Sequence, residues 1–389
     1  MKFFSNIFKF ALFLAMIFTI NCNSPNYKPD IVSLPKTEGF DKKIKAPTVP
    51  QYNYSYLAHG KTINDNFFWM LKEENKNKIL ELIESENQYA KSVMKKQKDL
   101  TEAIFMELKK RKNLDCGYVK KYYKIDEINA TTKEGLKIPI TMVYRKDLFK
   151  KDGSNPMYLV AYGAYGIEKK LTFKPYRLTL LDRGFIYAIA SVRGGGKKGK
   201  EWHEQGKLLN KKNSFRDFID CVEYLIQNKY THPDRLAVFG ASSGATLMAV
   251  AANMRPDLFK LVMLDVPAVD DLTYFLNCDS THFGYHFAEF GNPQEKKYFD
   301  YIFSYDPYQN IKSKNYPHML VTGGINDRNV PYWQPLKYLS KLRVNNTNDN
   351  LILLKMNTGG HEGIKDPDEY LKEIAFVFSY MFKVLNINN

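Results

Sequence analysis

The chain has 389 residues, of which 44% are hydrophobic and 25% are charged, and its formal net charge is +15. This composition is ordinary for a globular protein, and the length allows one large α/β domain with an appendage. A sequence pI of about 9.3 would suit nucleic acid or an acidic membrane surface, but the lysines are scattered and form no basic helix or aromatic–basic ladder. We therefore expect no nucleic-acid partner.

Residues 1–21 are predicted to be a secretory signal peptide. Two lysines precede the apolar run Phe10–Ile20, which is too short for a comfortable membrane span. Cys22 follows closely and is similar to the lipidation site of a bacterial lipoprotein. We expect an exported protein that a lipid on Cys22 attaches to the periplasmic or cell-envelope membrane, with residues 22–50 as a Pro- and Lys-rich tether. Ordinary signal cleavage and an uncleaved anchor remain open.

The cysteine and histidine spacings predict neither a metal site nor a cofactor. The sequence contains no C-x-x-C and no H-E-x-x-H pattern. If Cys22 carries a lipid, Cys116, Cys221 and Cys278 remain, and they allow at most one disulfide.

Residues 51–112 are predicted to be an N-terminal helical segment. Apolar side chains recur at helical spacing from Ile79 to Arg111, with Glu and Lys on the other face. We expect one or two amphipathic helices packed on the main domain, and a partner-binding helix is the alternative. Val119–Tyr144 then indicates a β-hairpin region with a turn at Thr131–Gly135.

Residues 113–389 are predicted to be one α/β domain. Expected strands and helices alternate along it. The strands are Met157–Val160, Phe185–Val192 and Leu261–Leu264, and the helices are Ser214–Gln227 and Glu369–Leu385. This alternation predicts a mostly parallel central sheet with helices on both faces.

The most informative segment is Leu236–Val250, where an apolar run enters G-x-S-x-G and a small-residue helical pattern leaves it. A strand, a tight turn and a helix in this order expose the serine hydroxyl above a sheet, which is the arrangement of a nucleophile in the α/β-hydrolase fold. The flanking glycines, Gly240 and Gly244, remove side chains that would collide in the turn. Ser242 is therefore the candidate nucleophile.

An acid and a base follow in the order that this fold uses, which is Ser, then Asp or Glu, then His. Asp327 follows the expected strand His318–Val321, and His361 follows the expected strand Leu351–Lys355. Ligand sites in open α/β sheets lie at the carboxyl ends of strands, so these side chains should meet. We expect His361 to accept the proton of Ser242 and Asp327 to orient the imidazole.

Segments from about Thr62 onward resemble the prolyl oligopeptidase family of serine peptidases, and oligopeptidase B most of all. The resemblance rests on Asp65-Asn66-Phe67-Phe68-Trp69, Leu180–Phe185, Val192–Gly196, Asn253–Phe259, Phe290-Gly291-Asn292-Pro293 and Tyr332-Trp333-Gln334-Pro335. It implies an α/β-hydrolase fold and peptide-bond hydrolysis through an acyl-enzyme. It also implies an oxyanion hole made by the hydroxyl of Tyr162 and the backbone N–H of Ser243.

Two departures from the family pattern are informative. Family members carry a β-propeller that covers the active site, but here the segment ending at Arg111 runs almost directly into Val119–Tyr144. We therefore expect a more open cleft. In oligopeptidase B, glutamates select Arg or Lys, and the matching positions hold His286 and Ala288.

The resemblance assigns the substrate pocket to His286, Glu289, Phe290 and Asn329. Only Glu289 is acidic, and Asn329 replaces a family arginine, beside Arg328. Acidic residues of the next subsite fall on Lys170 and Thr172. A pocket stripped of the glutamates that select Arg or Lys, on a basic chain, has little to attract a dibasic peptide, so we expect no strong Arg or Lys preference.

The sequence therefore predicts a serine endopeptidase or oligopeptidase with peptide substrates and Ser242 as nucleophile. Two other functions remain open, because esterases use the same triad and because a protein can keep this fold after it has lost catalytic activity. They are an esterase or other acyl hydrolase, and a weakly active binding or scaffold lipoprotein. The sequence leaves the oligomeric state open.

Overall fold

A computed structural model describes residues 33–41, 43–114, 119–277 and 284–387. Cys22 and the expected signal peptide lie outside these residues, as do Cys116 and Cys278. No helix in the described ranges is both long enough and apolar enough to cross a membrane.

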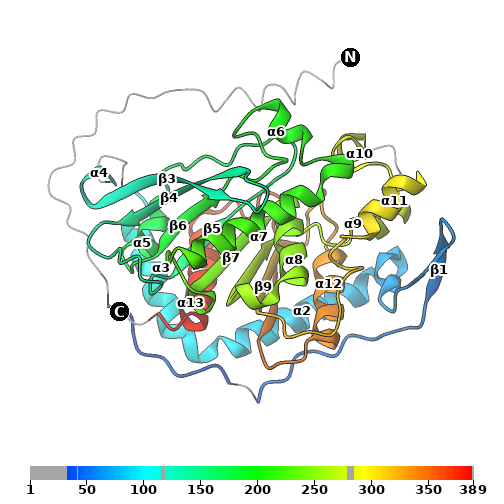
Figure 1. Ribbon diagram of the computed structural model, residues 1–389. Helices are drawn as coiled ribbons and strands as arrows, with labels where there is room; N and C mark the ends of the chain where they lie inside the picture. Colours follow the sequence, from blue (N-terminus) through cyan, green and yellow to red (C-terminus); the bar gives the residue numbers. More distant parts are fainter. Residues whose placement is uncertain (1–32, 42, 115–118, 278–283, 388–389) are drawn as a thin grey trace, which may run out of the picture.

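A mixed eight-stranded sheet forms the centre of the molecule, in the order β10-β9-β8-β7-β5-β6-β4-β3 (Figure 1). The strands are β3 Tyr123–Thr131, β4 Lys137–Arg145, β5 Met157–Val160, β6 Ile186–Ala190, β7 Leu236–Ala241, β8 Leu261–Asp265, β9 His318–Gly324 and β10 Ile352–Asn357. All neighbours from β10 to β6 pair in parallel, and only β4 pairs antiparallel with β6 and β3. The fold is that of an α/β hydrolase, as the sequence predicted.

Helices cover both faces of the sheet. They are α2 Lys76–Val93, α3 Lys98–Arg111, α4 Val119–Tyr122, α5 Leu178–Leu181, α6 Lys200–Glu204, α7 Lys212–Gln227, α8 Ser243–Met254, α9 Asp271–Asn277, α10 Gly284–Phe290, α11 Lys296–Phe303, α12 Trp333–Asn345 and α13 Pro367–Val384. In Figure 1, α7 and α8 lie in front of the sheet, with α13 and α3 behind it.

The central strands β5 to β9 are buried on both sides. Along β8, Val262 and Leu264 belong to the core beneath α7 and α8, whereas Leu261 and Met263 belong to the core beneath α13. Successive side chains of a strand point to opposite faces, so both faces must be apolar when both are covered. This requirement explains the continuous apolar runs in the sequence.

The hairpin expected in Val119–Tyr144 begins later than predicted. Tyr123 pairs with Arg145, the last residue of β4, so residues before Tyr123 have no partner strand to continue the ladder. Residues 119–122 form the short helix α4 instead.

The described part of the expected tether packs against the domain. Leu34 is buried in the core beneath α13, and Phe40 and Ile44 pack against its edge. The side chain of Gln97, which directly precedes α3, donates a hydrogen bond to the carbonyl of Glu38 at 2.8 Å. This segment therefore buries apolar surface, although its sequence has no periodic pattern.

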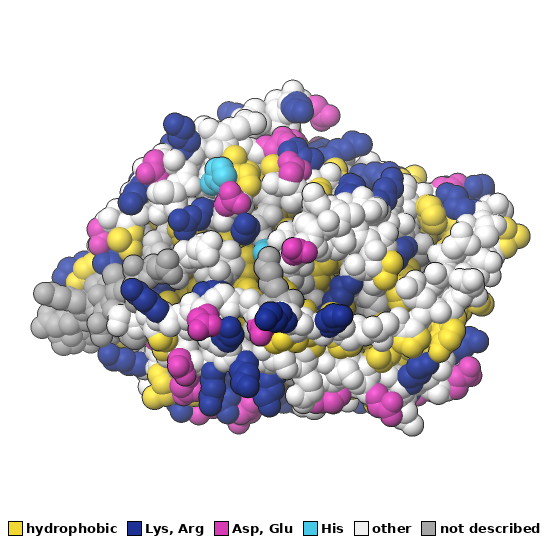
Figure 2. Space-filling model, turned by 90° about the horizontal axis from the view of Figure 1, so that it is seen from below, with side chains coloured by type: hydrophobic (Ala, Val, Ile, Leu, Met, Phe, Trp, Pro, Cys, Tyr) yellow, Lys and Arg dark blue, Asp and Glu magenta, His cyan; other side chains and the backbone are white. Residues whose placement is uncertain are grey.

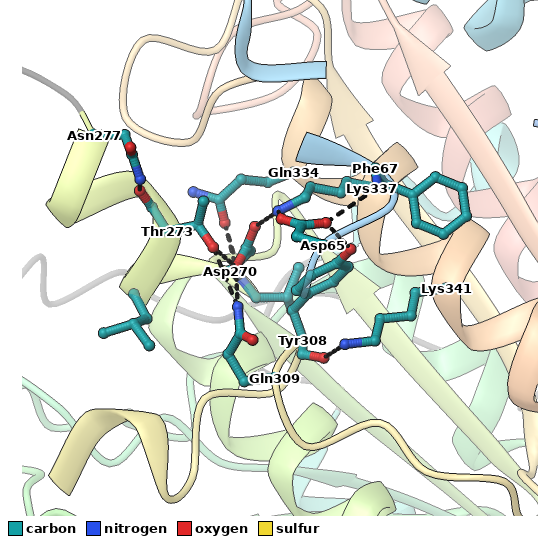
Figure 3. A network of polar contacts seen from close by, with 12 residues as sticks. Asp65, Phe67, Asp270, Thr273, Asn277, Tyr308, Gln309, Gln334, Lys337 and Lys341 are labelled. Atoms are coloured by element: carbon teal, nitrogen blue, oxygen red, sulfur yellow. Dashed lines mark hydrogen bonds and ion pairs between the residues drawn. The ribbon is translucent and has the colours of Figure 1, made fainter. Parts of the chain in front are cut away.

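A buried ion network fastens the N-terminal segment to α12 (Figure 3). Asp65 follows the hairpin of β1 (Ser55–Ala58) and β2 (Lys61–Asn64), and its carboxylate lies 2.6 Å from the Lys337 ammonium on α12. Lys337 also pairs with Asp270, which precedes α9. The Tyr308 hydroxyl donates to Asp65 at 2.5 Å. One buried cation thus joins three segments that are distant in the sequence.

Candidate active site

Ser242 lies in a strained turn between β7 and α8. Its φ of 56° and ψ of −127° are a backbone conformation that non-glycine residues rarely adopt. The turn is so tight that a Cβ on Gly240 would lie 2.1 Å from the carbonyl oxygen of Gly244. A Cβ on Gly244 would lie 2.9 Å from the carbonyl oxygen of Ala161. Both glycines of G-x-S-x-G are therefore required by close backbone contacts.

Asp327 and His361 form a hydrogen-bonded pair at the same edge of the sheet. Asp327 follows β9, and its Oδ1 accepts hydrogen bonds from the backbone N–H groups of Asn329 (2.8 Å) and Val330 (3.0 Å). Its Oδ2 lies 2.8 Å from Nδ1 of His361. Two backbone donors thus orient the carboxylate, and the carboxylate orients the imidazole, which leaves Nε2 of His361 as the acceptor for a proton.

The environment of His361 favours its protonated form. Burial lowers the pKa of His361, but the hydrogen bond and the charge of Asp327 outweigh it, and the pKa is raised above the usual 6.5. A base with this property accepts a proton more readily in the transition state.

The loops that carry the two residues touch. A Cβ on Gly324, at the end of β9, would lie 2.2 Å from the carbonyl oxygen of Gly359 on the loop after β10. The small residues of Thr322-Gly323-Gly324 and Thr358-Gly359-Gly360 therefore bring Asp327 and His361 together.

Ser242 and His361 share a neighbour, Asp265, at the end of β8. The backbone N–H of Ser242 donates to the carbonyl of Asp265 at 2.9 Å, and the charge of the Asp265 carboxyl interacts with His361. Among the described residues there is no hydrogen bond between Ser242 and His361 themselves. Such catalytic contacts are often long when no substrate is bound.

Tyr162 and Ser243 lie beside Ser242, where the resemblance expects an oxyanion hole. Burial raises the pKa of Tyr162 to about 12, and hydrogen bonding by the side chains of Ser243 and Ser242 opposes part of this rise. The phenol therefore stays protonated at neutral pH and keeps its donor. Ser243 begins α8, so its backbone N–H belongs to the first turn, where helical N–H groups have no intrahelical partner.

The expected pocket residues His286, Glu289 and Phe290 lie on α10. His286 Nδ1 is 2.8 Å from the Tyr165 hydroxyl, and the ring of Tyr165 packs edge-on against Phe290 at 5.7 Å between centroids. Burial lowers the pKa of His286. Tyr165 also interacts with Ser243. The rings of His286, Phe290 and Tyr165 therefore form an aromatic wall beside Ser243.

The carboxylate of Glu289 is not free. Its side chain is 3% exposed, and its oxygens lie 2.6 Å from Nε2 of His203 and 3.3 Å from the ammonium of Lys211. Asn329 is exposed and contributes its backbone N–H to Asp327, with Arg328 exposed beside it. Among the described residues, no hydrogen bond or ion pair joins Asn329 to Glu289.

Sequence reasoning missed Tyr165 and Lys211. Lys211 is buried, burial lowers its pKa to about 8, and its ammonium donates to the carbonyl of Gly163, next to Tyr162, at 2.7 Å. A lysine in a Lys-Lys pair is normally read as solvated surface, so no local signal could have identified it. Tyr165 lies in the same A-Y-G-A-Y-G loop as Tyr162, and that repeat was an available signal.

No group of three or more His, Cys, Asp or Glu side chains that could hold a metal ion occurs in the parts of the chain that the structure describes.

Two family models match this chain. The model described as "Prolyl oligopeptidase family" matches residues 171–388, and the model described as "Prolyl oligopeptidase, N-terminal beta-propeller domain" matches residues 47–124. In the described part of the second range, the strands are β1, β2 and the start of β3, and the rest is helical or irregular.

Several known proteins are similar to this chain. Dipeptidyl aminopeptidase BI from Pseudoxanthomonas mexicana is 40% identical over 273 residues, which cover 70% of this chain and 38% of the relative. Protease 2 from Moraxella lacunata is 37% identical over 271 residues, 69% of this chain and 39% of the relative. The structure of oligopeptidase B from Leishmania major has a TM-score of 0.66 at 40% identity, covering 70% of this chain and 38% of that one.

The chain spans about two fifths of the length of these relatives. Ser242, Asp327 and His361 all lie within the range of the first family model, which covers more than half of the chain. Together with the α/β-hydrolase sheet, these matches show that the chain belongs to the prolyl oligopeptidase family.

Proposed function

We propose that this chain is a serine peptidase that hydrolyses peptide bonds through an acyl-enzyme on Ser242. The observation that carries the proposal is the Asp327–His361 pair at the carboxyl edge of the sheet that exposes Ser242 in its strained turn. The chemistry needs a nucleophile, a base and an orienting acid, and these three side chains supply them.

In the proposed reaction, Ser242 Oγ attacks the peptide carbonyl carbon while His361 Nε2 accepts the hydroxyl proton. The tetrahedral oxyanion receives hydrogen bonds from the Tyr162 hydroxyl and the Ser243 N–H. His361 then gives the proton to the leaving amine, the C–N bond breaks, and an ester on Ser242 remains. Water attacks this ester with His361 again as base, which releases the acid and restores the serine.

Active-site labelling tests the proposal directly. A fluorophosphonate probe should label the wild-type chain, and Ser242→Ala should abolish the label. Ser85→Ala, at an exposed serine of α2, offers a matched control substitution. Labelling that persists in Ser242→Ala, or a wild type that never reacts, would contradict the assignment.

We also propose that the peptidase has no strong preference for Arg or Lys. Glu289 is buried in contact with His203 and Lys211, and the wall formed by Tyr165 and Phe290 is aromatic. Matched arginyl and alanyl amide substrates, with their ester counterparts, should differ by less than about tenfold in kcat/KM. An arginyl preference of a hundredfold or more would refute this specificity.

We further propose export and attachment through a lipid on Cys22. The support is the sequence of residues 1–22 alone. Mass spectrometry of the mature protein should find a diacylglyceryl-modified Cys22 as the first residue, and a free N-terminus at Asn23 or Ser24 excludes the lipid.

A further inference from the structure

A cavity of about 300 Å³ lies next to the proposed active site, on the α13 face of the sheet. Its lining includes Ala161, Ala241 and Gly363, which are close neighbours in sequence of Tyr162, Ser242 and His361. Ligand pockets in proteins begin at about this volume. The cavity reaches the surface at Lys169, Lys170 and Tyr370, all of which are exposed.

Several aromatic rings line the cavity. They are Tyr158, Tyr176, Tyr187, Phe239, Tyr370 and Phe378. Tyr158 stacks on Tyr187 with centroids 5.6 Å apart and on Phe239 at 5.8 Å. The wall is therefore rigid and largely apolar, which suits the aliphatic or aromatic stem of a ligand.

Three cations lie around this wall. The Arg177 guanidinium lies 4.2 Å from the centre of the Tyr187 ring, and its Nη1 donates to the carbonyl of Thr172 at 2.5 Å. Its Nε is buried and has no hydrogen-bond partner among the described residues. The Lys169 ammonium lies 4.7 Å from the centre of the Tyr162 ring, beside the oxyanion position. Lys170 is 3.6 Å from Glu168.

Two acidic residues also line the cavity, and neither cancels this charge. Glu373 on α13 forms an ion pair with Lys355 on β10. Asp265 accepts a hydrogen bond from the Thr322 hydroxyl at 2.6 Å, and burial raises the pKa of Asp265, which favours its neutral form. The cavity therefore has an excess of positive charge and an unused buried donor.

We propose that this cavity is a subsite for a carboxylate-bearing side chain of a peptide substrate. The apolar stem packs on the tyrosines, and the carboxylate lies at Arg177 and Lys169, which are suited to charge-assisted hydrogen bonds. The net charge of +15 supports the same substrate class, because a basic protein attracts acidic peptides over long range. This inference rests on the proposed peptidase function and specifies its substrate class.

Binding to the full chain with Ser242→Ala tests the proposal without turnover. Fluorescent hexapeptides should carry Glu, Gln or Lys at one position, moved through the peptide in turn. We expect Glu at one position to bind about tenfold more tightly than the isosteric Gln, with Lys weakest. Glutarate should compete with the Glu peptide and should leave binding of the Gln peptide unchanged.

Variants locate the effect. Arg177→Met and, separately, Lys169→Met should reduce the Glu-to-Gln ratio to about twofold or less. Lys296→Met removes an exposed cation of α11 that is outside the cavity lining, and it should leave the ratio unchanged. If Arg177→Met does not fold, Lys169→Met carries the test alone.

Equal binding of Glu and Gln peptides at every position, a failure to bind any peptide, or a preference that survives both variants would overturn the subsite. The proposed function fails in a different way, namely when the wild type hydrolyses none of these peptides while the Glu preference in binding persists.

Discussion

At the scale of the residue, catalysis in this chain would depend on how each polar group is held. Asp327 is bound by two backbone N–H groups on one oxygen and by His361 on the other. Tyr162 keeps its proton because burial raises its pKa to about 12. Preorganised groups of this kind lower a barrier because they need no rearrangement during the reaction.

Replacing Asp327 by Asn should lower kcat by about a thousandfold to ten-thousandfold, because the imidazole loses both its orientation and the charge that stabilises its protonated form. Peptide or ester turnover measures this loss. Because Asn can still accept the two backbone hydrogen bonds, the unfolding midpoint should change little, and a large fall in stability would contradict this account.

The pH dependence follows from the same pair. Activity needs neutral His361, so kcat/KM should rise with pH through the pKa of His361, which lies above the usual 6.5. Removing the charge in Asp327→Asn should move this acid limb to lower pH. A kcat/KM profile from about pH 5 to 9 measures the acid limb of the wild type and of the variant. An acid limb at the same pH in both would contradict the assignment.

Replacing Tyr162 by Phe should remove one oxyanion donor. We expect kcat to fall about a hundredfold or more with little change in KM, because the hydrogen bond forms mainly in the transition state. Steady-state kinetics on a neutral peptide measures the two parameters. A change confined to KM would mean that Tyr162 contacts the substrate and not the oxyanion.

At the scale of the element, ion networks place the segments that the sheet alone does not fix. Lys337 on α12 holds Asp65, which follows β2, and Asp270, which precedes α9. The α9 region leads to α10, which carries His286 and Phe290. The N-terminal segment is therefore linked through one cation to the part of the chain that forms the pocket wall.

Replacing Lys337 by Met should destabilise the fold by about 3–5 kcal/mol, because two buried carboxylates, Asp65 and Asp270, lose the cation that pairs with both of them. Urea unfolding measures this free energy. Lys341→Met is the matched control on the same helix, since the Lys341 ammonium donates to the Tyr308 carbonyl and interacts with Asp65 and Asp270 only beyond ion-pair distance, and its loss should cost about 1 kcal/mol. Equal losses in the two variants would contradict a special role for Lys337.

At the scale of the whole molecule, the sheet and its helices surround the site without a further domain between α3 and β3. α3 ends at Arg111 and β3 begins at Tyr123, and the Arg111 guanidinium is anchored to buried Asp182 at 2.6 Å.

Figure 2 shows one face of the molecule, where Lys and Arg side chains are intermixed with Asp and Glu. Charge is thus distributed broadly on this face.

A chain with this organisation should not select substrates by length. We expect a peptide of about thirty residues to be cleaved with a kcat/KM within about threefold of a pentapeptide that contains the same bond. Mass spectrometry of the two digests measures the rates. Cleavage confined to the short peptide would show that another part of the structure restricts access.

The sequence by itself determined the fold class and the order of the candidate site residues. Apolar runs marked most of the central strands near their observed bounds, since a strand buried on both faces needs continuous apolar residues. The G-x-S-x-G turn was recognisable because its backbone contacts tolerate only glycine on both sides of Ser242. These signals are local, so the sequence displays them directly.

Only the tertiary structure decided which charged side chains form buried ion pairs with one another. It pairs Glu289 with Lys211 and His203, buries Lys337 between Asp65 and Asp270, and packs Leu34 from the expected tether into the core. It also gathers Arg177 and Lys169 around the cavity beside Ser242. These partners are distant along the chain, and the protonation and availability of a charged group depend on burial and neighbours that exist only after folding.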